Sequence, residues 1–284
     1  MSSHVLALAL AGLLVSAVTP KSSSLAHPSR YKSNNDTLER SQNSRIVNGE
    51  PAKSGDVRWQ VAILVKATST NDLDVCGGSA VAPNWVLTAA HCVAGVSREQ
   101  VEVRSGSVRL DDTLAQRSVP RRILIHKDWN SVTYDNDVAL LEADLASSVQ
   151  AVPMIEGDSD VQSTDHMQIS GFGRVSEFGA TSNTLLLAYV SFISYDSCND
   201  RQAYNGQVHV GTMFCADAPF GDAETSDSCK GDSGGPITRE HKGKIEQVGI
   251  ISWGNGCGDP SFPGVYVRLS QYRSWIDLQI HSRA

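Results

Sequence analysis

From Ile46 onward the sequence consists of short apolar runs that are separated by turn-forming residues. Each run is five to nine residues long and rich in β-branched and aromatic side chains, with Gly, Asn, Asp or Ser near its ends. Runs of this kind are typical of the strands of all-β sandwiches and barrels. They lie at 61–65, 85–90, 122–126, 137–142, 167–172, 185–193, 247–253 and 264–269. The sequence therefore predicts an all-β fold.

The C-terminal stretch has a different period, typical of a helix. Tyr272, Trp275 and Ile276 recur at near-helical intervals, and Ser270 stands before them as the expected N-cap. We therefore expect one C-terminal helix over about 270–282. With 284 residues, the chain suits one large β domain or two domains of about 100 to 150 residues each.

Residues 1–26 are predicted to be a signal peptide. An apolar run from Val5 to Val18 is too short to span a bilayer, and small residues after it suit cleavage near Ala17 or Ala26. A membrane anchor is the alternative, and the absence of Lys and Arg before the run weakens the signal interpretation. No later run is apolar enough to cross a membrane, so we expect a secreted, extracellular protein with no membrane partner.

Residues 27–45 are predicted to be a pro-segment, with a linker as the alternative. The stretch is polar, has no strand or helix period, and cannot bury enough apolar surface to fold alone. It holds the Asn35–Thr37 glycosylation sequon. The first 45 residues contribute +3 to the formal net charge of −7, so the rest of the chain contributes −10. This acidic body argues against nucleic acid as a partner.

The cysteines form an even set in a chain with a predicted signal peptide, which favours three disulfides. A zinc site is the alternative, but no Cys-x-x-Cys pair occurs, and His91 next to Cys92 cannot make such a site alone. The six cysteines are Cys76, Cys92, Cys198, Cys215, Cys229 and Cys257.

Three separate stretches supply the groups that acyl transfer by a serine requires. Ser233 lies in CKGDSGGP, where neighbouring glycines let the backbone approach a substrate carbonyl. His91 follows an apolar run as a candidate base. Asp137 begins the DVALLE run, where a carboxylate would be partly buried and would need a donor, and Asp135 competes with it for the same role.

Five short motifs, which occur along the chain in the family's order, resemble those of the trypsin and chymotrypsin family of serine proteases. The resemblance runs from Ile46 to about Ile280. It implies a peptidase domain over 46–284 with two six-stranded antiparallel barrels, at about 46–157 and about 158–269. The motifs are IVNGE at 46–50, LTAAHC at 87–92, DNDVALL at 135–141, GDSGGP at 231–236 and SWG at 252–254.

The resemblance also implies a catalytic role for each motif residue. Ser233 would be the nucleophile, His91 the general base and then acid, and Asp137 the group that holds the imidazole tautomer. Asp137 is preferred to Asp135 because the family places its acid directly before this strand. The backbone N–H groups of Gly231 and Ser233 would form the oxyanion hole.

Substrate recognition is implied in the same way. Asp227 stands where the family has the floor of its primary pocket, with small wall residues at Gly254 and Gly264, so the resemblance implies cleavage after Arg or Lys. Ser252 would lie behind Asp137. The backbone of Ser252, Trp253 and Gly254 would pair with an extended substrate.

Disulfide pairing and activation follow from the resemblance as well. It pairs Cys76 with Cys92, Cys198 with Cys215, and Cys229 with Cys257. Cleavage after Arg45 would free the α-amino group of Ile46, which would pair with Asp232 and order the oxyanion loop. The chain is thus expected to be made as a zymogen.

The expected partners are protein or peptide substrates and protein protease inhibitors, and we expect a monomer. The resemblance implies no cofactor and no metal, and 105–116 lacks the glutamates of the family's calcium loop. The 216–225 stretch is longer than the corresponding stretch in many family members. Lys230 would face the side of the substrate and disfavour basic substrate residues there. The alternative function is a non-catalytic binding or inhibitor protein on the same scaffold, a class that usually lacks a triad member.

Overall fold

The computed structural model describes residues 49–66, 73–156, 160–174, 179–218, 227–259 and 261–282. The expected signal peptide, the pro-segment with its sequon, the Arg45–Ile46 junction and most of the 216–225 stretch lie outside these ranges and stay predictions. Within the described ranges, no helix combines the length and the apolar character that a bilayer crossing needs.

The first sheet contains seven antiparallel strands in the described part of the chain. They are β2 (Gln60–Lys66), β3 (Leu73–Ala82), β4 (Trp85–Thr88), β5 (Val101–Ser105), β6 (Gln116–Ser118), β7 (Arg122–Ile125) and β8 (Ala139–Glu142). Their spatial order is β6-β5-β2-β3-β4-β8-β7. The run at 85–90 ends as a strand at Thr88, because Ala90 begins a helix.

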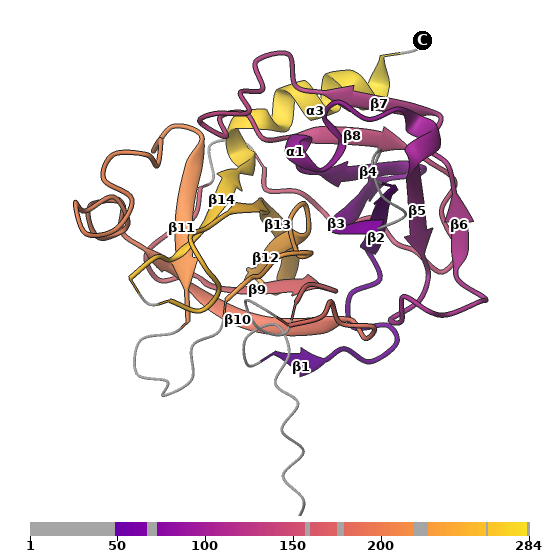
Figure 1. Ribbon diagram of the computed structural model, residues 1–284, viewed down its shortest axis with the longest axis horizontal. Coiled ribbons are helices and arrows are strands. Elements are labelled where there is room, and N and C mark those ends of the chain that lie inside the picture. The colour runs from indigo at the N-terminus through magenta and orange to yellow at the C-terminus, as the bar shows by residue number, and fades with distance from the viewer. Residues whose placement is uncertain are drawn as a thin grey trace, which may run out of the picture. The chain divides into compact units, whose positions relative to one another are not determined.

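The second sheet closes on itself and has one added strand. It consists of β1 (Glu50–Pro51), β9 (His166–Gly171), β10 (Leu186–Ile193), β11 (Met213–Asp217), β12 (Pro236–His241), β13 (Lys244–Trp253) and β14 (Gly264–Arg268). The order is β1-β10-β11-β14-β13-β12-β9, and β9 also pairs with β10, which makes a six-stranded ring. β1 joins the outside of this ring (Figure 1). The structure confirms the all-β fold with two barrel-like sheets.

The helices of the described residues are short. They are α1 (Ala90–Val93), α2 (Tyr195–Cys198), α3 (Arg273–His281) and two 3₁₀ turns, η1 (Arg98–Gln100) and η2 (Leu269–Tyr272). The predicted C-terminal helix is confirmed as η2 followed by α3 (Figure 1). Ser270 is not its N-cap: Ser270 lies inside η2, and Tyr272 precedes α3, because Leu269 and Tyr272 are buried and carry the chain from β14 straight into the helix.

One apolar core extends through both sheets. It includes Ile63 and Leu140 of the first sheet, Ile237 and Tyr266 of the second, and Ile276 of α3. Every residue of β2 except its last is buried, which explains its continuous apolar run.

Buried hydrogen bonds also join the two sheets. Ser79 Oγ donates to Gln247 Oε1 at 2.7 Å, and Ser170 Oγ donates to Gln60 Oε1 at 2.6 Å. A side chain from each sheet takes part in both bonds. A site between the sheets therefore has a fixed frame.

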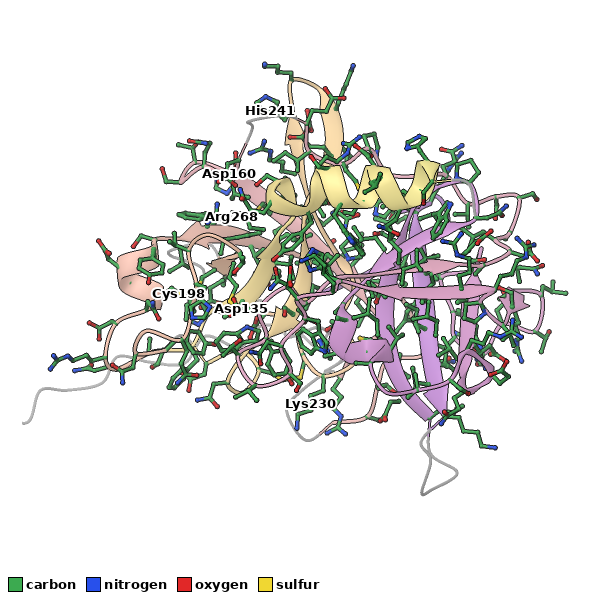
Figure 2. The ribbon with its side chains drawn as sticks, turned by 90° about the horizontal axis from the view of Figure 1, so that it is seen from above. Asp135, Asp160, Cys198, Lys230, His241 and Arg268 are labelled. Atoms are coloured by element: carbon green, nitrogen blue, oxygen red, sulfur yellow. A yellow bond between two sulfur atoms is a disulfide. The ribbon has the colours of Figure 1, made fainter. Side chains whose placement is uncertain are left out.

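Two arginines hold the connection that leads into the second sheet. Arg268 Nη1 donates to Asp160 Oδ2 at 2.5 Å (Figure 2). The nearly buried Arg239 donates from Nη1 to Asp165 Oδ2, also at 2.5 Å, and from Nε to Glu246 Oε1 at 2.9 Å. Buried guanidinium groups need such partners, so segment 160–165 is fixed to the barrel.

Stability is expected to depend on the protonation of His126. Its ring contacts Tyr272 and Trp275 of the C-terminal turn and helix, at centroid distances of 5.4 and 5.0 Å. Burial lowers the pKa of His126 from the usual 6.5, so the unfolded chain binds this proton more tightly. The neutral His126 ring therefore contributes fully to the stability of the folded state above pH 6.5. That contribution is lost as the pH falls below 6.5 and the ring becomes protonated. Urea unfolding at pH 5 and pH 8 should show a smaller pH difference for His126→Phe; an unchanged difference contradicts the prediction.

Candidate active site

Strand pairing brings His91 and Asp137 to the same edge of the first sheet. β4 and β8 are antiparallel neighbours in which Thr88 pairs with Ala139. His91 lies three residues after Thr88, in α1, and Asp137 lies two residues before Ala139. Two distant segments of the sequence therefore place a histidine and a carboxylate side by side.

The Asp137 carboxylate is almost fully buried, at 1% exposure, and three groups surround it. Oδ1 accepts the backbone N–H of His91 at 2.8 Å, while Oδ2 lies 2.7 Å from Nδ1 of His91 and accepts the Ser252 hydroxyl at 2.5 Å. These bonds offset the cost of burying the charge. A carboxylate beside Nδ1 places the proton on that nitrogen and leaves Nε2 free to accept one.

Asp135, the competing acid, lies elsewhere. Its oxygens lie 2.7 and 2.8 Å from Nδ1 of His209, in the loop before β11. The structure thus brings Asp137 to His91 and gives Asp135 a different histidine.

The Ser233 loop is closely packed rather than flexible. Gly77 of β3 donates to the Ser233 carbonyl at 2.8 Å, and Gly234 donates to the Ile251 carbonyl at 2.7 Å. Gly234 has φ +83°, and a Cβ there would lie 2.2 Å from Oγ1 of Thr88. Only glycine fits such a position without displacing its neighbours.

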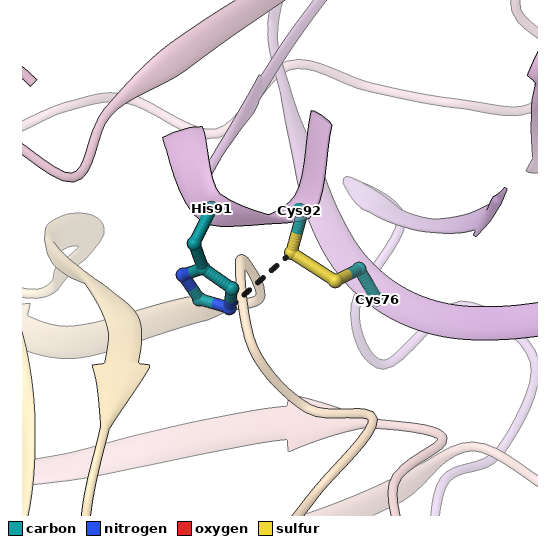
Figure 3. Close-up of side chains that lie close together, drawn as sticks. All are labelled: Cys76, His91 and Cys92. Carbon is teal, nitrogen blue, oxygen red and sulfur yellow. Dashed lines mark hydrogen bonds between the residues drawn. A yellow bond between two sulfur atoms is a disulfide. The ribbon is translucent and has the colours of Figure 1, made fainter. Parts of the chain in front are cut away.

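A disulfide lies between His91 and the Ser233 loop. Cys92 Sγ is bonded to Cys76 and lies 3.7 Å from Nε2 of His91 and 3.5 Å from the carbonyl oxygen of Ser233 (Figure 3). Cys76, His91 and Cys92 have the spacing of a metal site. The two sulfurs are oxidised, however, and have no thiolate to offer a metal.

The loop leaves two backbone donors unused. Among the described residues, the N–H groups of Gly231 and Ser233 donate to no protein acceptor. Those of Asp232, Gly234 and Gly235 donate to the carbonyls of Cys229, Ile251 and Asp232. Gly231 has φ +103°, a conformation that side chains disfavour. Two free donors next to a serine are suited to binding an oxyanion.

Asp232 points away from Ser233 into the second sheet. Its fully buried carboxylate accepts the N–H groups of Gly173 at 2.7 Å and Cys229 at 3.0 Å. A Cβ at Gly171 or Gly173 would lie 2.1 or 2.3 Å from its oxygens. Burial raises the pKa of Asp232 to about 7. A cation placed here would therefore be strongly favoured.

A pocket of about 420 Å³ opens beside these groups. His91 and Ser233 line it, together with Asp227, Trp253 and Tyr134. Asp227 is 4% exposed, and its two oxygens accept the N–H groups of Ser228 at 2.7 Å and Gly258 at 2.8 Å. Burial raises the pKa of Asp227 to about 7.

Two glycines keep the Asp227 carboxylate accessible. A Cβ at Gly264 would lie 3.0 Å from Oδ1 of Asp227 and 2.9 Å from Oη of Tyr266. A Cβ at Gly254 would lie 4.0 Å from the Gly264 Cα, so the two glycines face one another. Neither residue carries a side chain that would narrow the pocket.

Two further disulfides brace the second sheet. Cys229 is bonded to Cys257, which ties the Ser233 loop to the chain beside Gly258, and Cys198 is bonded to Cys215 of β11. Lys230 is exposed and lines the pocket.

Sequence reasoning named Trp253 but missed Tyr134, which forms an aromatic wall of the pocket together with it. Tyr134 contacts the His91 ring at 5.6 Å and the Trp253 ring at 6.4 Å between centroids, and Trp253 contacts Tyr204 at 4.8 Å. Tyr134 stands alone in a polar stretch, and no sequence pattern connects it to the other rings.

Comparison with known proteins gives consistent matches. The Trypsin family model matches residues 46–276. The chain is 32% identical over 256 residues to the urokinase-type plasminogen activator of Gallus gallus, covering 84% of this chain and 58% of that protein. It is 34% identical over 243 residues to the vitellin-degrading protease of Bombyx mori (83% and 86%), and 35% identical over 250 residues to complement factor I of Rattus norvegicus (83% and 39%). The chain thus spans 39 to 86% of the length of these relatives.

Proposed function

Because this chain belongs to the trypsin family of serine proteases, we propose that it is a secreted endopeptidase that cleaves peptide bonds after Arg or Lys. The observation that carries the proposal is the buried Asp137 carboxylate on Nδ1 of an imidazole that shares its pocket with Ser233. Protein substrates follow from the family. An extracellular location and a monomeric state remain parts of the proposal.

The proposed mechanism uses each of these groups once in each half-reaction. His91 Nε2 takes the proton of the Ser233 hydroxyl as Oγ attacks the scissile carbonyl, and the N–H groups of Gly231 and Ser233 bind the oxyanion. The imidazolium, stabilised by Asp137, then gives that proton to the leaving amine. Water repeats the sequence on the acyl-enzyme, which releases the acid product and restores Ser233.

The proposed preference for Arg and Lys rests on Asp227. A buried carboxylate at the closed end of a pocket is stabilised by a cation, and its raised pKa reflects the cost of its charge there. Arg should exceed Lys wherever the forked guanidinium reaches both oxygens.

An activity assay on protein cleaved after Arg45 tests the proposal. Arg, Lys and Phe amide substrates are compared, with and without a fluorophosphonate that labels reactive serines. We expect hydrolysis of the Arg and Lys amides, and labelling that is lost in Ser233→Ala. Absence of both hydrolysis and labelling rejects the protease function, whereas a preference for Phe rejects only the role of Asp227.

We further propose that the chain is a zymogen activated after Arg45. The new α-amino group of Ile46 would meet the buried Asp232 carboxylate, whose raised pKa favours a cationic partner. The ion pair would hold the loop that carries Gly231 and Ser233 in the binding conformation.

Self-activation is expected because the residue before the scissile bond is Arg45. Purified wild-type zymogen should be cut at this bond at a rate that rises with its concentration, while the Ser233→Ala zymogen stays intact. Mass spectrometry of the new N-terminus measures both. Equal rates for the two proteins would show that another protease does the cutting.

A further inference from the structure

Asp135 is held by four polar contacts, although it takes no part in orienting His91. Both oxygens face Nδ1 of His209, Oδ1 accepts the Thr212 hydroxyl at 3.1 Å, and Oδ2 accepts the Thr133 hydroxyl at 2.9 Å. Partial burial raises the pKa of Asp135, but the hydrogen bonds from His209 and Thr133 outweigh it, and the net shift is downward. The carboxylate is thus stabilised in its charged form.

His209 lies in the loop before β11, and its backbone is bonded to the start of that strand. Its carbonyl oxygen accepts the N–H groups of Thr212 at 3.0 Å and Met213 at 2.8 Å, and Met213 begins β11. Arg268 of β14 donates its N–H to the Thr212 carbonyl at 2.8 Å. The backbone of His209 is therefore held by the second sheet. Asp135, in contrast, belongs to the loop that leads into β8 of the first sheet. Their contact ties the two halves together at the edge of the pocket.

The Asp135–His209 contact lies next to Tyr134, which forms part of the aromatic wall of the pocket. Tyr134 has φ +57° and Asn136 has φ +56°, so Asp135 sits between two left-handed residues. This conformation costs a tyrosine about 1 to 2 kcal/mol and persists only where its surroundings hold it. The Tyr134 N–H donates to the Asn130 carbonyl at 2.9 Å, and Asn136 Nδ2 donates to the Asp128 carbonyl at 2.9 Å. Both of these bonds lie within the same loop. From the opposite half, Tyr272 donates its hydroxyl to Asn136 Oδ1 at 3.1 Å and the Trp253 ring contacts Tyr134, and the Asp135–His209 contact adds a restraint between them.

We propose that Asp135 and His209 are positioning residues that fix Tyr134 beside His91 and so determine the KM of extended substrates. The inference rests on the proposed protease function. A single arginine derivative fills the pocket above Asp227 and ends near Ser233. Tyr134 lines the same pocket as His91 and Ser233, so in this proposal the residues before the arginine of a longer substrate lie against the Tyr134 ring. Losing the tie therefore weakens binding of the longer substrate and leaves the chemical step intact.

Kinetics with substrates of two lengths test this inference. Wild type, His209→Ala, Asp135→Ala and the double variant are each assayed with a blocked arginine amide and with a blocked tripeptide amide that ends in arginine. We expect KM for the tripeptide to rise about tenfold in both single variants, with kcat changed less than about twofold and the single-residue substrate unaffected. The double variant should match the singles, because the two residues act as one unit.

Two further variants separate positioning from general destabilisation. His209→Gln keeps a side-chain N–H donor and should recover much of the tripeptide KM. His166→Ala is the matched control, because His166 is an exposed histidine whose Nδ1 lies 3.2 Å from Ser191 Oγ and contacts no carboxylate among the described residues. Near-ultraviolet circular dichroism of the Tyr134, Trp129 and Trp253 rings should change in His209→Ala and not in the control.

The outcomes are distinguishable. Wild-type protein that cleaves neither arginine substrate rejects the proposed function itself. Active wild type with an unchanged tripeptide KM in His209→Ala, equal losses on both substrates, or additive effects in the double variant rejects the positioning role.

Discussion

Asp137→Asn is expected to lower kcat about 10⁴-fold at pH 8 while KM stays nearly constant. The amide has the shape of the carboxylate and keeps one oxygen, which can still accept either the backbone N–H of His91 or the hydroxyl of Ser252. It presents an N–H to Nδ1, however, which drives the imidazole into the tautomer that protonates Nε2 and removes the base for Ser233. Burst and steady-state kinetics on an arginine amide measure the change.

Asp135→Asn is the matched control for this prediction, because it makes the same chemical change two residues earlier in the same loop. Its kcat should remain within about twofold of wild type. A large loss of kcat in Asp135→Asn together with a small one in Asp137→Asn would reverse the assignment of the two acids. Comparable unfolding midpoints for both variants exclude loss of fold as the cause.

Asp227→Asn is expected to lower kcat/KM for arginine substrates by about 30- to 5,000-fold, which corresponds to the 2 to 5 kcal/mol lost when one partner of a buried charge pair is removed. The guanidinium would then be buried against an amide. Substrates with Phe should lose much less. Asp259→Asn is the control, since Asp259 is an exposed acid one residue after Gly258. Equal losses on Arg and Phe substrates would contradict a role in specificity.

The raised pKa of Asp227 adds a pH dependence to this prediction. Because the free carboxyl binds its proton with a pKa of about 7, cation affinity is complete above pH 7 and falls up to tenfold for each pH unit below it. The dissociation constant of benzamidine, a cationic ligand, is measured with the Ser233→Ala variant between pH 5 and pH 8. Because this variant is inactive, the pH dependence of the catalytic steps does not enter the measurement. Affinity that is constant over this range contradicts the expected protonation.

Sequence reasoning found strands that have a continuous apolar run, such as β2 and β8. It missed β3, because LDVCGGSAVA carries two glycines and a cysteine and looks like a turn. The structure explains the glycines: a Cβ at Gly77 would lie 2.7 Å from the Gly235 Cα. Close approach of the Ser233 loop, a tertiary requirement, therefore overrides strand propensity there.

The candidate site divides in the same way. Residues within recognisable motifs, such as His91 and Ser233, were identified from the sequence, and the structure brings them to one pocket. Tyr134 lies just outside the DNDVALL motif, and His209 has no motif near it. Their importance depends on contacts between loops 74 residues apart, as for Asp135 and His209, and no period or spacing in the sequence encodes such a contact.

β1 gives the proposed activation a kinetic meaning. Glu50 and Pro51 pair with Leu187 and Leu186 of β10, and Ala52 donates to the Leu185 carbonyl at 2.9 Å. Ile46 precedes Glu50, the first residue of β1, by only four residues, and a fully extended segment of this length spans about 13 Å. A freed N-terminus would thus search a small volume, with an effective concentration in the millimolar range. β1 makes the new amine a tethered ligand, and a weakened β1 would slow activation without altering any residue of the pocket.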